Sequence, residues 1–223
     1  MTDTGSKPAS VNPAITLQAR SGLRRGMLAL RCLVPLLLLF PTLLRAQNLP
    51  TLKPRIGPPV LQELMGGCSL RCAFPWEVVA VSPQSPTGKN ERPVYETNDD
   101  DASTAWIDDS PSSIGTKLIF RFPKKLPKEL EETPFYGFDL ANGCIKSEQQ
   151  WKLYGRVKRA KLYYNNKPLY YVEFADTRHW QTISFDDIMI RQGDSMTLEI
   201  LEVYPGTKSQ GVAITELVLQ GAH

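Results

Sequence analysis

The residues with the clearest chemical potential lie in one short acidic stretch. Asp99, Asp100 and Asp101 are consecutive, and Thr104 and Trp106 follow closely. Adjacent carboxylates repel one another unless a cation, a basic partner or water neutralises them. Hard cations such as calcium bind about six to eight oxygen ligands, drawn from carboxylates, hydroxyls and loop carbonyls. The stretch therefore predicts either an ion-organised loop or an exposed binding rim.

The spacing of the side-chain oxygens shows which kind of calcium loop the stretch could form. Asp99, Asp101 and Thr104 offer side-chain oxygens within one tight turn, and Ala102 and Ser103 add carbonyls. The spacing is not that of an EF-hand, because no glycine or terminal glutamate stands at the required offset. A structural calcium ion is one expectation, and a solvated loop is the other.

Aromatic residues could take part in ligand recognition or could fill the core. The Trp106 indole, at the exit of the acidic stretch, could be a platform on which a sugar stacks. It could equally be a corner of the core, which the high average burial of tryptophan favours. Neighbouring tyrosines at 163–164 and 170–171 should point to opposite faces of their strands, so half of them should be exposed.

The sequence contains few arrangements of residues that are typical of catalytic sites. His179 stands between Arg178 and Trp180 without a nucleophile motif nearby, and nothing singles out a glycosidase pair among the carboxylates. Phosphate-cradling glycine loops and histidines with metal-ligand spacing are also missing from the sequence. We therefore expect a protein that is not an enzyme, with no catalytic residue to assign.

The N-terminal 46 residues have the features of a targeting segment. Arg20, Arg24, Arg25 and Arg31 precede an uncharged, leucine-rich run over 32–44. A basic lead followed by an apolar core of this length is typical of a secretory signal peptide. A membrane anchor is the alternative, although the run is shorter than the roughly 20 residues of a spanning helix. Export by a signal peptide over 1–46 predicts a secreted, periplasmic or cell-envelope location.

The charge balance changes once this segment is set aside. Of 26 basic and 23 acidic side chains, 20 basic and 22 acidic ones lie after residue 46, which leaves a net charge of about −2. Nucleic acid is therefore not an expected partner, because phosphate recognition needs a clustered basic surface. One basic run, from Lys152 to Lys161, stands out, and we interpret it as a solvated strand-and-turn face.

Three cysteines remain after residue 46, namely Cys68, Cys72 and Cys144. In an exported chain, the simplest arrangement is one disulfide and one free thiol. Cys68 could pair with Cys72, four positions away, and Cys144 could pair with either of them. A zinc site is not expected, because a fourth ligand is missing.

The order of apolar runs and turns predicts one all-β domain. A linker or N-terminal segment over 47–75, which includes Cys68 and Cys72, is expected before a domain over 76–223. Its proline-rich part, 47–60, is expected to be extended, and 60–71 could be a short helix or could simply lead to the domain. The asparagine pair at 165–166 is a strong turn signal. The predicted strands cover 77–81, 117–122, 135–140, 156–164, 169–174, 180–185, 195–204 and 213–220. Short strands with polar turns and no long helical pattern predict an antiparallel jelly-roll β-sandwich.

Several motifs resemble those of one known family. Asp-Asp-Asp-Ala-Ser-Thr-Ala-Trp at 99–106 is similar to the Asp-Gly-Asp-Pro-Ser-Thr-Ala-Trp signature of discoidin-like, coagulation-factor-type C domains. Further matching segments follow in order: Ser-Ile-Gly at 113–115, Leu-Ala-Asn-Gly-Cys-Ile-Lys-Ser at 140–147, Arg-Val-Lys at 156–158, Val-Tyr-Pro-Gly-Thr-Lys at 203–208 and Ala-Ile-Thr-Glu-Leu at 213–217. Together they resemble the branch called the NADase-type glycan-binding domain, over about 76–220.

The resemblance implies a galactose-binding-like jelly roll and a structural calcium ion. In related sugar-binding modules the ion is held by acidic-loop carboxylates, a threonine and a glutamate of the last strand. That ligand set corresponds here to Asp99, Asp101, Thr104 and Glu216. Asp100 stands where the family usually has glycine, which is the main departure from the pattern.

The resemblance also implies a non-catalytic module that binds carbohydrate. Ligands of this fold usually meet loops at one end of the sandwich, so the expected contacts lie near Trp106, Tyr136 and Trp180. The expected partner is a glycan or glycoconjugate. The alternatives are an envelope scaffold that binds a cell-envelope protein without a sugar and, third, a small jelly-roll hydrolase or lyase.

Overall fold

The computed structural model describes a β-sandwich built from residues after position 47. The expected signal peptide and the Cys68–Cys72 pairing lie outside the described residues. Within the described part of the chain, no helix is long and apolar enough to cross a membrane. The described residues are 48–60, 70, 76–83, 92–108, 110–125 and 132–221.

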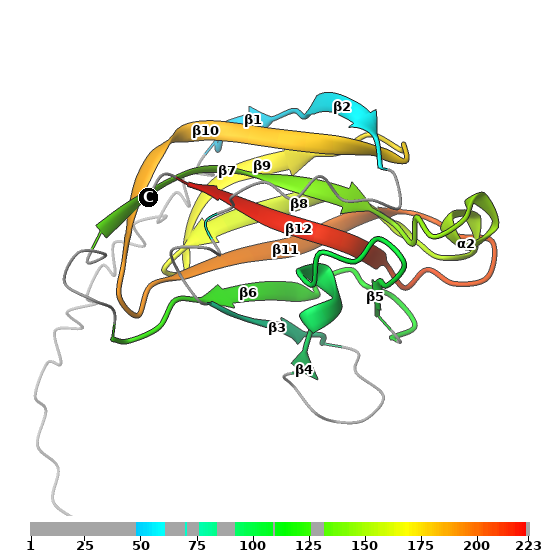
Figure 1. Cartoon of the computed structure of the whole chain (residues 1–223), viewed down its shortest axis with the longest axis horizontal. Coiled ribbons are helices and arrows are strands. Elements are labelled where there is room, and N and C mark those ends of the chain that lie inside the picture. Colours follow the sequence, from blue (N-terminus) through cyan, green and yellow to red (C-terminus); the bar gives the residue numbers. More distant parts are fainter. Residues whose placement is uncertain are drawn as a thin grey trace, which may run out of the picture. The chain divides into compact units, whose positions relative to one another are not determined.

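Two sheets form the sandwich (Figure 1). The first sheet runs in the order β1 (Thr51–Leu52), β9 (Lys167–Glu173), β8 (Arg156–Tyr164), β11 (Ser195–Tyr204), β6 (Lys117–Arg121), β3 (Glu77–Val81) and β4 (Arg92–Pro93). The second runs in the order β2 (Arg55–Pro59), β10 (His179–Arg191), β7 (Glu132–Asn142), β12 (Ala213–Gly221) and β5 (Trp106–Ile107). The pairings are antiparallel except for that between β1 and β9. The predicted all-β sandwich is confirmed.

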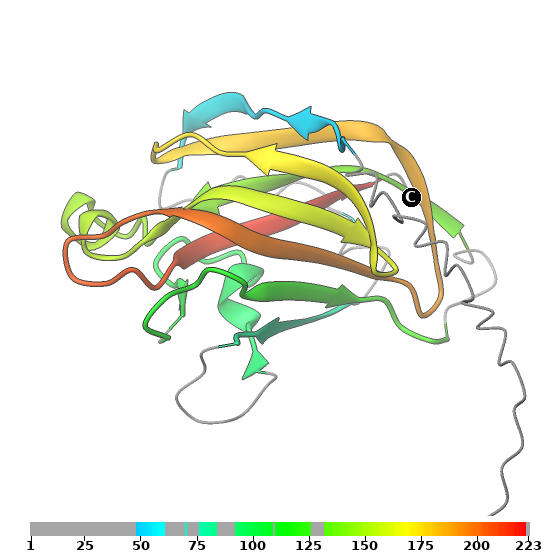
Figure 2. The same cartoon turned by 180° about the vertical axis from the view of Figure 1, so that it is seen from behind.

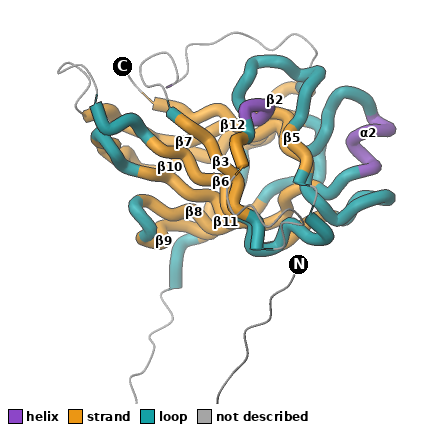
Figure 3. Tube along the Cα trace, turned by 90° about the horizontal axis from the view of Figure 1, so that it is seen from below, coloured by secondary structure: helices purple, strands orange, loops and turns teal. Residues whose placement is uncertain are grey.

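The core lies between the two sheets because the strands alternate in polarity. In β6, Leu118 and Phe120 are buried, whereas the residues on either side of them are partly exposed. In β7, Phe138 and Leu140 enter the same core from the other sheet. Successive side chains of a strand point to opposite faces, so this alternation gives each sheet one apolar inner face. Figure 3 separates the two layers of strands.

The asparagine pair between β8 and β9 forms the predicted hairpin turn. Asn165 and Asn166 have φ angles of +46° and +63°. Two consecutive residues with positive φ match the twist of the flanking strands, and asparagine tolerates this conformation better than most residues. The turn sets the pairing of β8 with β9, which places Lys161 opposite Tyr171.

The proline-rich segment expected to be a linker contributes to both sheets instead. We call residues 50–60 the N-terminal strap. Its first part, β1, pairs with β9, and its second part, β2, pairs with β10 (Figure 2). The prolines are tolerated because both strands lie at sheet edges, where a missing N–H leaves no partner unpaired. The sandwich therefore begins well before the predicted boundary at residue 76.

Loops from both sheets meet at one end of the sandwich, which we call the helix end. It carries α2 (Glu148–Leu153) and β5, whereas β12 ends at the opposite end (Figures 1 and 3). Ser147 caps the N-terminus of α2, and its side chain accepts a hydrogen bond from the Gln150 N–H at 3.1 Å. The connection from β11 to β12 is tied to this helix, because the Thr207 N–H donates to the Lys152 carbonyl at 2.9 Å.

Candidate functional site

The acidic loop (residues 98–105) lies at the helix end and is closed by its own side chains. The Asp101 N–H donates to Asp99 Oδ1 at 3.0 Å, and the Thr104 hydroxyl donates to Asp99 Oδ2 at 2.7 Å. The Thr104 N–H and hydroxyl are both within hydrogen-bond distance of the Asp101 carbonyl. Hydrogen bonds from Ser103 hold the pKa of Asp101 below its usual value. The turn anticipated from the spacing of these residues is therefore present.

Asp100 adopts a backbone conformation that suits glycine. Its φ angle is +59°, in the left-handed region. Among non-glycine residues, asparagine and aspartate visit this region most readily, because their short polar side chains can bond locally. The departure from the family signature at this position is thus compatible with the tight turn that glycine would make.

The structure brings Glu216 of β12 against this loop, as the resemblance implies. The Asp101 N–H donates to Glu216 Oε1 at 3.2 Å, although the residues are 115 positions apart. Glu216 is fully buried, and its Oε2 has no hydrogen-bond partner. Burial, with the adjacent Asp99 carboxylate, raises the pKa of Glu216 to about 8. At neutral pH this carboxyl group is mostly protonated unless a cation stabilises its charge.

The side chains gathered here have the oxygen ligands that a hard cation prefers. Asp99, Asp101, Thr104 and Glu216 supply only oxygen atoms, and the unpaired Glu216 Oε2 is a buried acceptor without a donor. Among the described residues, no group of three or more histidine, cysteine, aspartate or glutamate side chains is placed to hold a metal ion. A cation here would therefore depend on the hydroxyl and carbonyl oxygens of the loop as well as on carboxylates.

A small apolar cluster lies directly behind the acidic loop. Ala102, from the loop itself, is buried together with Val60, Ala141 and Ile145. Two partly buried indoles, those of Trp151 and Trp180, pack against this cluster. We call these six residues the satellite cluster. Because Ala102 belongs to it, the conformation of the acidic loop and the support of both indoles are linked.

Trp180 is a partly buried aromatic member of this arrangement. It lies at the start of β10, and the N-terminal strap passes close to it, with Gly57 next to its Cβ. Basic groups surround the cluster. Arg178 donates from Nη2 to the Ile145 carbonyl at 2.8 Å, and Lys146 is close enough to Asp101 to lower its pKa. An indole edge beside cationic and carboxylate groups provides both an apolar face and polar partners for a ligand.

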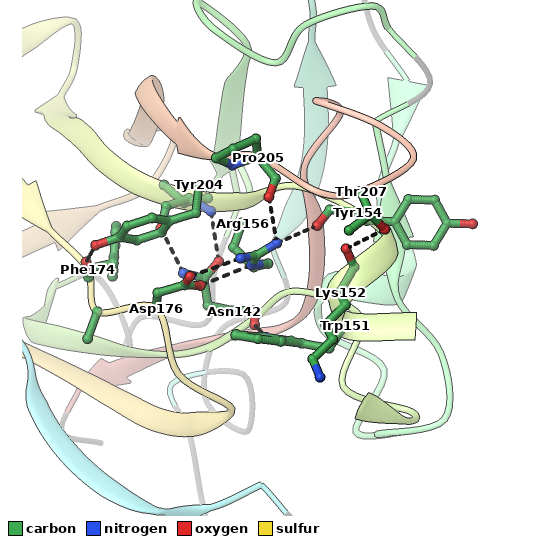
Figure 4. Close-up of polar contacts among 12 residues, drawn as sticks. Asn142, Trp151, Lys152, Tyr154, Arg156, Phe174, Asp176, Tyr204, Pro205 and Thr207 are labelled. Carbon is green, nitrogen blue, oxygen red and sulfur yellow. Dashed lines mark hydrogen bonds and ion pairs between the residues drawn. The ribbon is translucent and has the colours of Figure 1, made fainter. Parts of the chain in front are cut away.

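Trp151, by contrast, is held by structural contacts (Figure 4). Its indole N–H donates to the Asn142 carbonyl at 3.0 Å, and the Arg156 guanidinium lies 4.4 Å from the ring centroid. Arg156 also forms a two-point ion pair with Asp176, at 3.0 and 2.9 Å, and donates to the Tyr154 and Pro205 carbonyls. Arg156 therefore ties the helix end together.

Trp106 occupies the core rather than a binding surface. It is 5% exposed and belongs to the main core cluster. Its strand, β5, pairs with Ala213 and Ile214 of β12. The expectation that Trp106 contacts a ligand is corrected, because a ring this buried presents no face to a sugar. The alternative interpretation as a corner of the core is the one that the structure has.

Tyr136 is exposed but lies far from Trp180. Its ring is 37% exposed, and its hydroxyl donates to the Gly221 carbonyl at 3.3 Å, near the end of the last strand. Gln181 pairs with Leu140, so Tyr136 is separated from the Trp180 level by about five residues of β7, or roughly 16 Å. The three predicted ligand contacts therefore do not form one site, because Trp106 is buried in the core and Tyr136 lies far from Trp180.

Sequence reasoning missed the partners of Trp180. Arg178 and Trp151 lie in segments that carried no motif of their own, and Val60 lies in the presumed linker. The adjacent Arg-His-Trp at 178–180 was a usable signal, but only the fold shows that it faces Ile145. Cys144 is a free, buried cysteine whose burial raises its thiol pKa, and it has no visible part in this site.

Comparisons with known proteins place the chain in a family. A search of curated protein sequences found no match. Among solved structures, the CBM32-1 and CBM32-2 domains of Clostridium perfringens ZmpB in complex with GalNAc are similar, with 10% identity, a TM-score of 0.49 and coverage of 76% of this chain and 39% of that one. A second ZmpB structure of these domains gives 11% identity, a TM-score of 0.48 and coverage of 76% and 41%.

A mycobacterial arabinofuranosyltransferase, AftD, is also similar, with 16% identity, a TM-score of 0.39 and coverage of 66% of this chain and 12% of that one. The chain thus spans about two fifths of the ZmpB chains and a small part of AftD. The family of NAD glycohydrolase translocation F5/8 type C domains matches residues 74–220, which is the whole sandwich apart from the N-terminal strap. The chain therefore belongs to this family of discoidin-like domains.

Proposed function

We propose that the protein is a non-catalytic binding module that recognises glycan through the helix end of its sandwich. The observation that carries this proposal is the placement of the partly buried Trp180 indole on the satellite cluster, with Arg178 and Lys146 near the same cluster and acidic loop. An aromatic face flanked by hydrogen-bonding groups is the usual form of a site for small polar ligands. Membership of an F5/8 type C family supports binding rather than chemistry.

Calcium has a supporting role in this proposal. A cation held by Asp99, Asp101, Thr104 and Glu216 would neutralise the loop and fix Ala102 against the satellite cluster. The unpaired Oε2 of the buried Glu216 supports this assignment. The ion would therefore act on the ligand site indirectly, by holding the loop that supports Trp180.

The cellular setting belongs to the same proposal. Export directed by residues 1–46 would bring the domain to glycans or glycoconjugates outside the cytoplasm. A cell-envelope protein is the alternative partner, in which case the same end of the sandwich would bind protein and no sugar.

A glycan-array screen of the chain tests the proposal. We expect binding to a restricted set of saccharides, and we expect Trp180→Ala to abolish it. Tyr136→Ala is the matched control, because it removes an exposed aromatic from the opposite end and should leave binding unchanged. Failure against a broad panel, with the wild-type fold intact, would favour the envelope-protein alternative. Equal loss in both variants would show that the helix end is not the site.

A further inference from the structure

The basic run at 152–161 is only partly explained by the helix end. Arg156 is buried in the contacts with Asp176 and Trp151, and Lys152 pairs with Glu148 of its own helix. The remaining cations, Lys158, Arg159 and Lys161, belong to β8. These three residues belong to the seven-stranded sheet and have no part in the proposed function.

Arg159 and Lys161 lie on the outer face of this sheet. Ala160 and Leu162 belong to the core cluster, so the residues that alternate with them face outward. Tyr163 shares that face. By the same argument, Lys117 of β6 also points outward, because its neighbour Leu118 lies in the core. Four residues from two strands thus occupy one side of the sheet.

The strand register brings these groups into a row. Lys117 pairs with Glu199 of β11, Glu199 pairs with Lys161, and Lys161 pairs with Tyr171 of β9. Two strand spacings separate Lys117 from Lys161, or about 10 Å, and Arg159 lies about 7 Å further along β8. The three cations therefore stand about 7 to 10 Å apart, with Lys117 and Lys161 in the row and Arg159 beside its Lys161 end.

Tyrosine rings lie between these cations. Lys161 Nζ is 5.2 Å from the Tyr163 centroid and 5.6 Å from the Tyr171 centroid. The Arg159 guanidinium lies 4.4 Å from the Tyr171 centroid, and Lys117 Nζ lies 6.0 Å from that of Tyr163. Such contacts restrict long side chains that would otherwise lose conformational entropy on binding. The cations are thus held in place before any ligand arrives.

The face keeps a positive surplus, although the residues after position 46 together carry a net charge of about −2. Lys117, Lys158, Arg159 and Lys161 stand against three carboxylates, those of Glu173, Glu199 and Glu202, and Glu173 also pairs with Lys53. The Glu199 side chain is 20% exposed and accepts from the Tyr163 hydroxyl, whereas the Lys117 side chain is 44% exposed. Lys161 forms no ion pair within the part of the chain that the structure describes. An approaching anion therefore meets cations first.

We infer that the outer face of the seven-stranded sheet, through Lys117, Lys161 and Arg159, binds an acidic polysaccharide. The alternation of cations with tyrosine rings matches a chain whose single carboxylate or sulfate groups are separated by sugar rings. Duplex nucleic acid carries about one negative charge per 1.7 Å, which is far denser than this row of cations. This surface is distinct from the helix end and does not involve Trp180.

Retention of the chain on immobilised polygalacturonate and chondroitin sulfate tests this inference. We expect binding that weakens with salt, and a loss of about tenfold or more in affinity for Lys117→Gln/Lys161→Gln. The slope of log affinity against log salt should fall by about one for each cation removed. Lys152→Gln/Lys208→Gln changes the net charge equally at the helix end and should bind like the wild type. Lys161→Arg keeps the charge and should also bind.

Several results would overturn the inference. One is no retention of the wild-type chain at about 50 mM salt, which is low enough to leave surface charges weakly screened. Another is an equal loss of binding in both double variants, which would indicate general charge attraction. Equal binding to poly-glutamate or to duplex DNA would exclude a saccharide-specific surface. Trp180→Ala should leave this binding intact, so failure of the glycan site and failure of this surface are distinguishable. Thermal unfolding of each variant verifies that its fold is retained.

Discussion

The Arg156 guanidinium lies 4.4 Å from the centroid of the Trp151 ring, and this contact joins the first residue of β8 to the α2 helix. Arg156 is simultaneously paired with Asp176 and bound to two backbone carbonyls (Figure 4). Only a planar guanidinium group, with its several N–H donors, can make these contacts together, and the ammonium group of a lysine cannot replace it. The helix end is therefore organised around one side chain.

Arg156→Lys should lower the free energy of unfolding by about 2–3 kcal/mol, because it breaks the two-point pair of a largely buried guanidinium and removes the donor to the Tyr154 and Pro205 carbonyls. Urea unfolding measures this loss. Arg191→Lys is the matched control, since Arg191 forms an exposed pair with Glu132 and should change stability by less than about 0.5 kcal/mol. Equal effects of the two substitutions would contradict a central role for Arg156.

Gly143→Ala should destabilise the same region. Gly143 has a φ angle of +95°, and an added Cβ would lie 2.7 Å from Trp151 and 2.8 Å from Arg156. The backbone conformation and the overpacking together should cost about 3 kcal/mol. Gly193→Ala provides the comparison, because Gly193 has a φ of +76° and an added Cβ would make only an ordinary contact, 3.8 Å from Lys124 Cγ. It should cost about 1 kcal/mol, and a similar loss at both positions would argue against the clash.

Asp100 should prefer glycine to alanine. With a φ of +59°, Asp100→Gly should be more stable than Asp100→Ala by about 1 kcal/mol, since only glycine adopts this conformation without steric cost. Differential scanning calorimetry of the two variants measures the difference. At Glu96, in the 3-10 helix η1 (Tyr95–Thr97), the order should be reversed. Greater stability of Asp100→Ala would show that the left-handed turn is not maintained in solution.

Calcium should raise the melting temperature, and a chelator should lower it. At a concentration 100 times the dissociation constant, a ligand contributes about 2.7 kcal/mol, or about 5–10 °C for a domain of this size. Glu216→Gln should abolish the response to calcium, because it removes the charge of the buried carboxylate. If a chelator leaves the melting temperature unchanged, in the wild type and in Asp101→Ala, the acidic loop does not bind a stabilising calcium ion.

Substitution of Trp106 should affect mainly stability, whereas substitution of Trp180 should affect mainly glycan binding. Trp106→Ala should lower the free energy of unfolding by about 3–5 kcal/mol, as expected for a large buried aromatic. Trp180→Ala removes a partly exposed ring and should cost much less, while abolishing glycan binding. Chemical denaturation of both variants, run beside the binding assay, provides the comparison. Comparable destabilisation would mean that Trp180 is structural.

The sequence predicted those features that depend on local pattern. The alternation around Leu118 and Leu162 indicated sandwich strands, and the asparagine pair at 165–166 indicated the hairpin turn, because each signal is complete within a few residues. The acidic loop was also recognisable from its own residues. Its contact with Glu216 came from family resemblance, since nothing local links positions 115 residues apart.

Features that depend on distant partners were missed. Pro58 and Pro59 resemble a linker, because a sequence window does not reveal that an edge strand can accept them. Trp106 illustrates the same difficulty. A tryptophan at the end of a loop has the same sequence signal whether its ring stacks on a sugar or is buried in the core, as it is here. The row formed by Lys117 and Lys161 needs the register of β11 between them, and periodicity alone does not set that register.

The N-terminal strap has a consequence for the order in which the chain can fold. Gly57 bonds to His179 across 122 positions, and Arg55 reaches Thr182 across 127. During synthesis, which runs from the N-terminus, the strap emerges before either of its partner strands exists. It must stay unpaired until β9 and β10 have been made, so both sheet edges close late. A chain interrupted before β10 would therefore keep a free, proline-rich strand at its leading end.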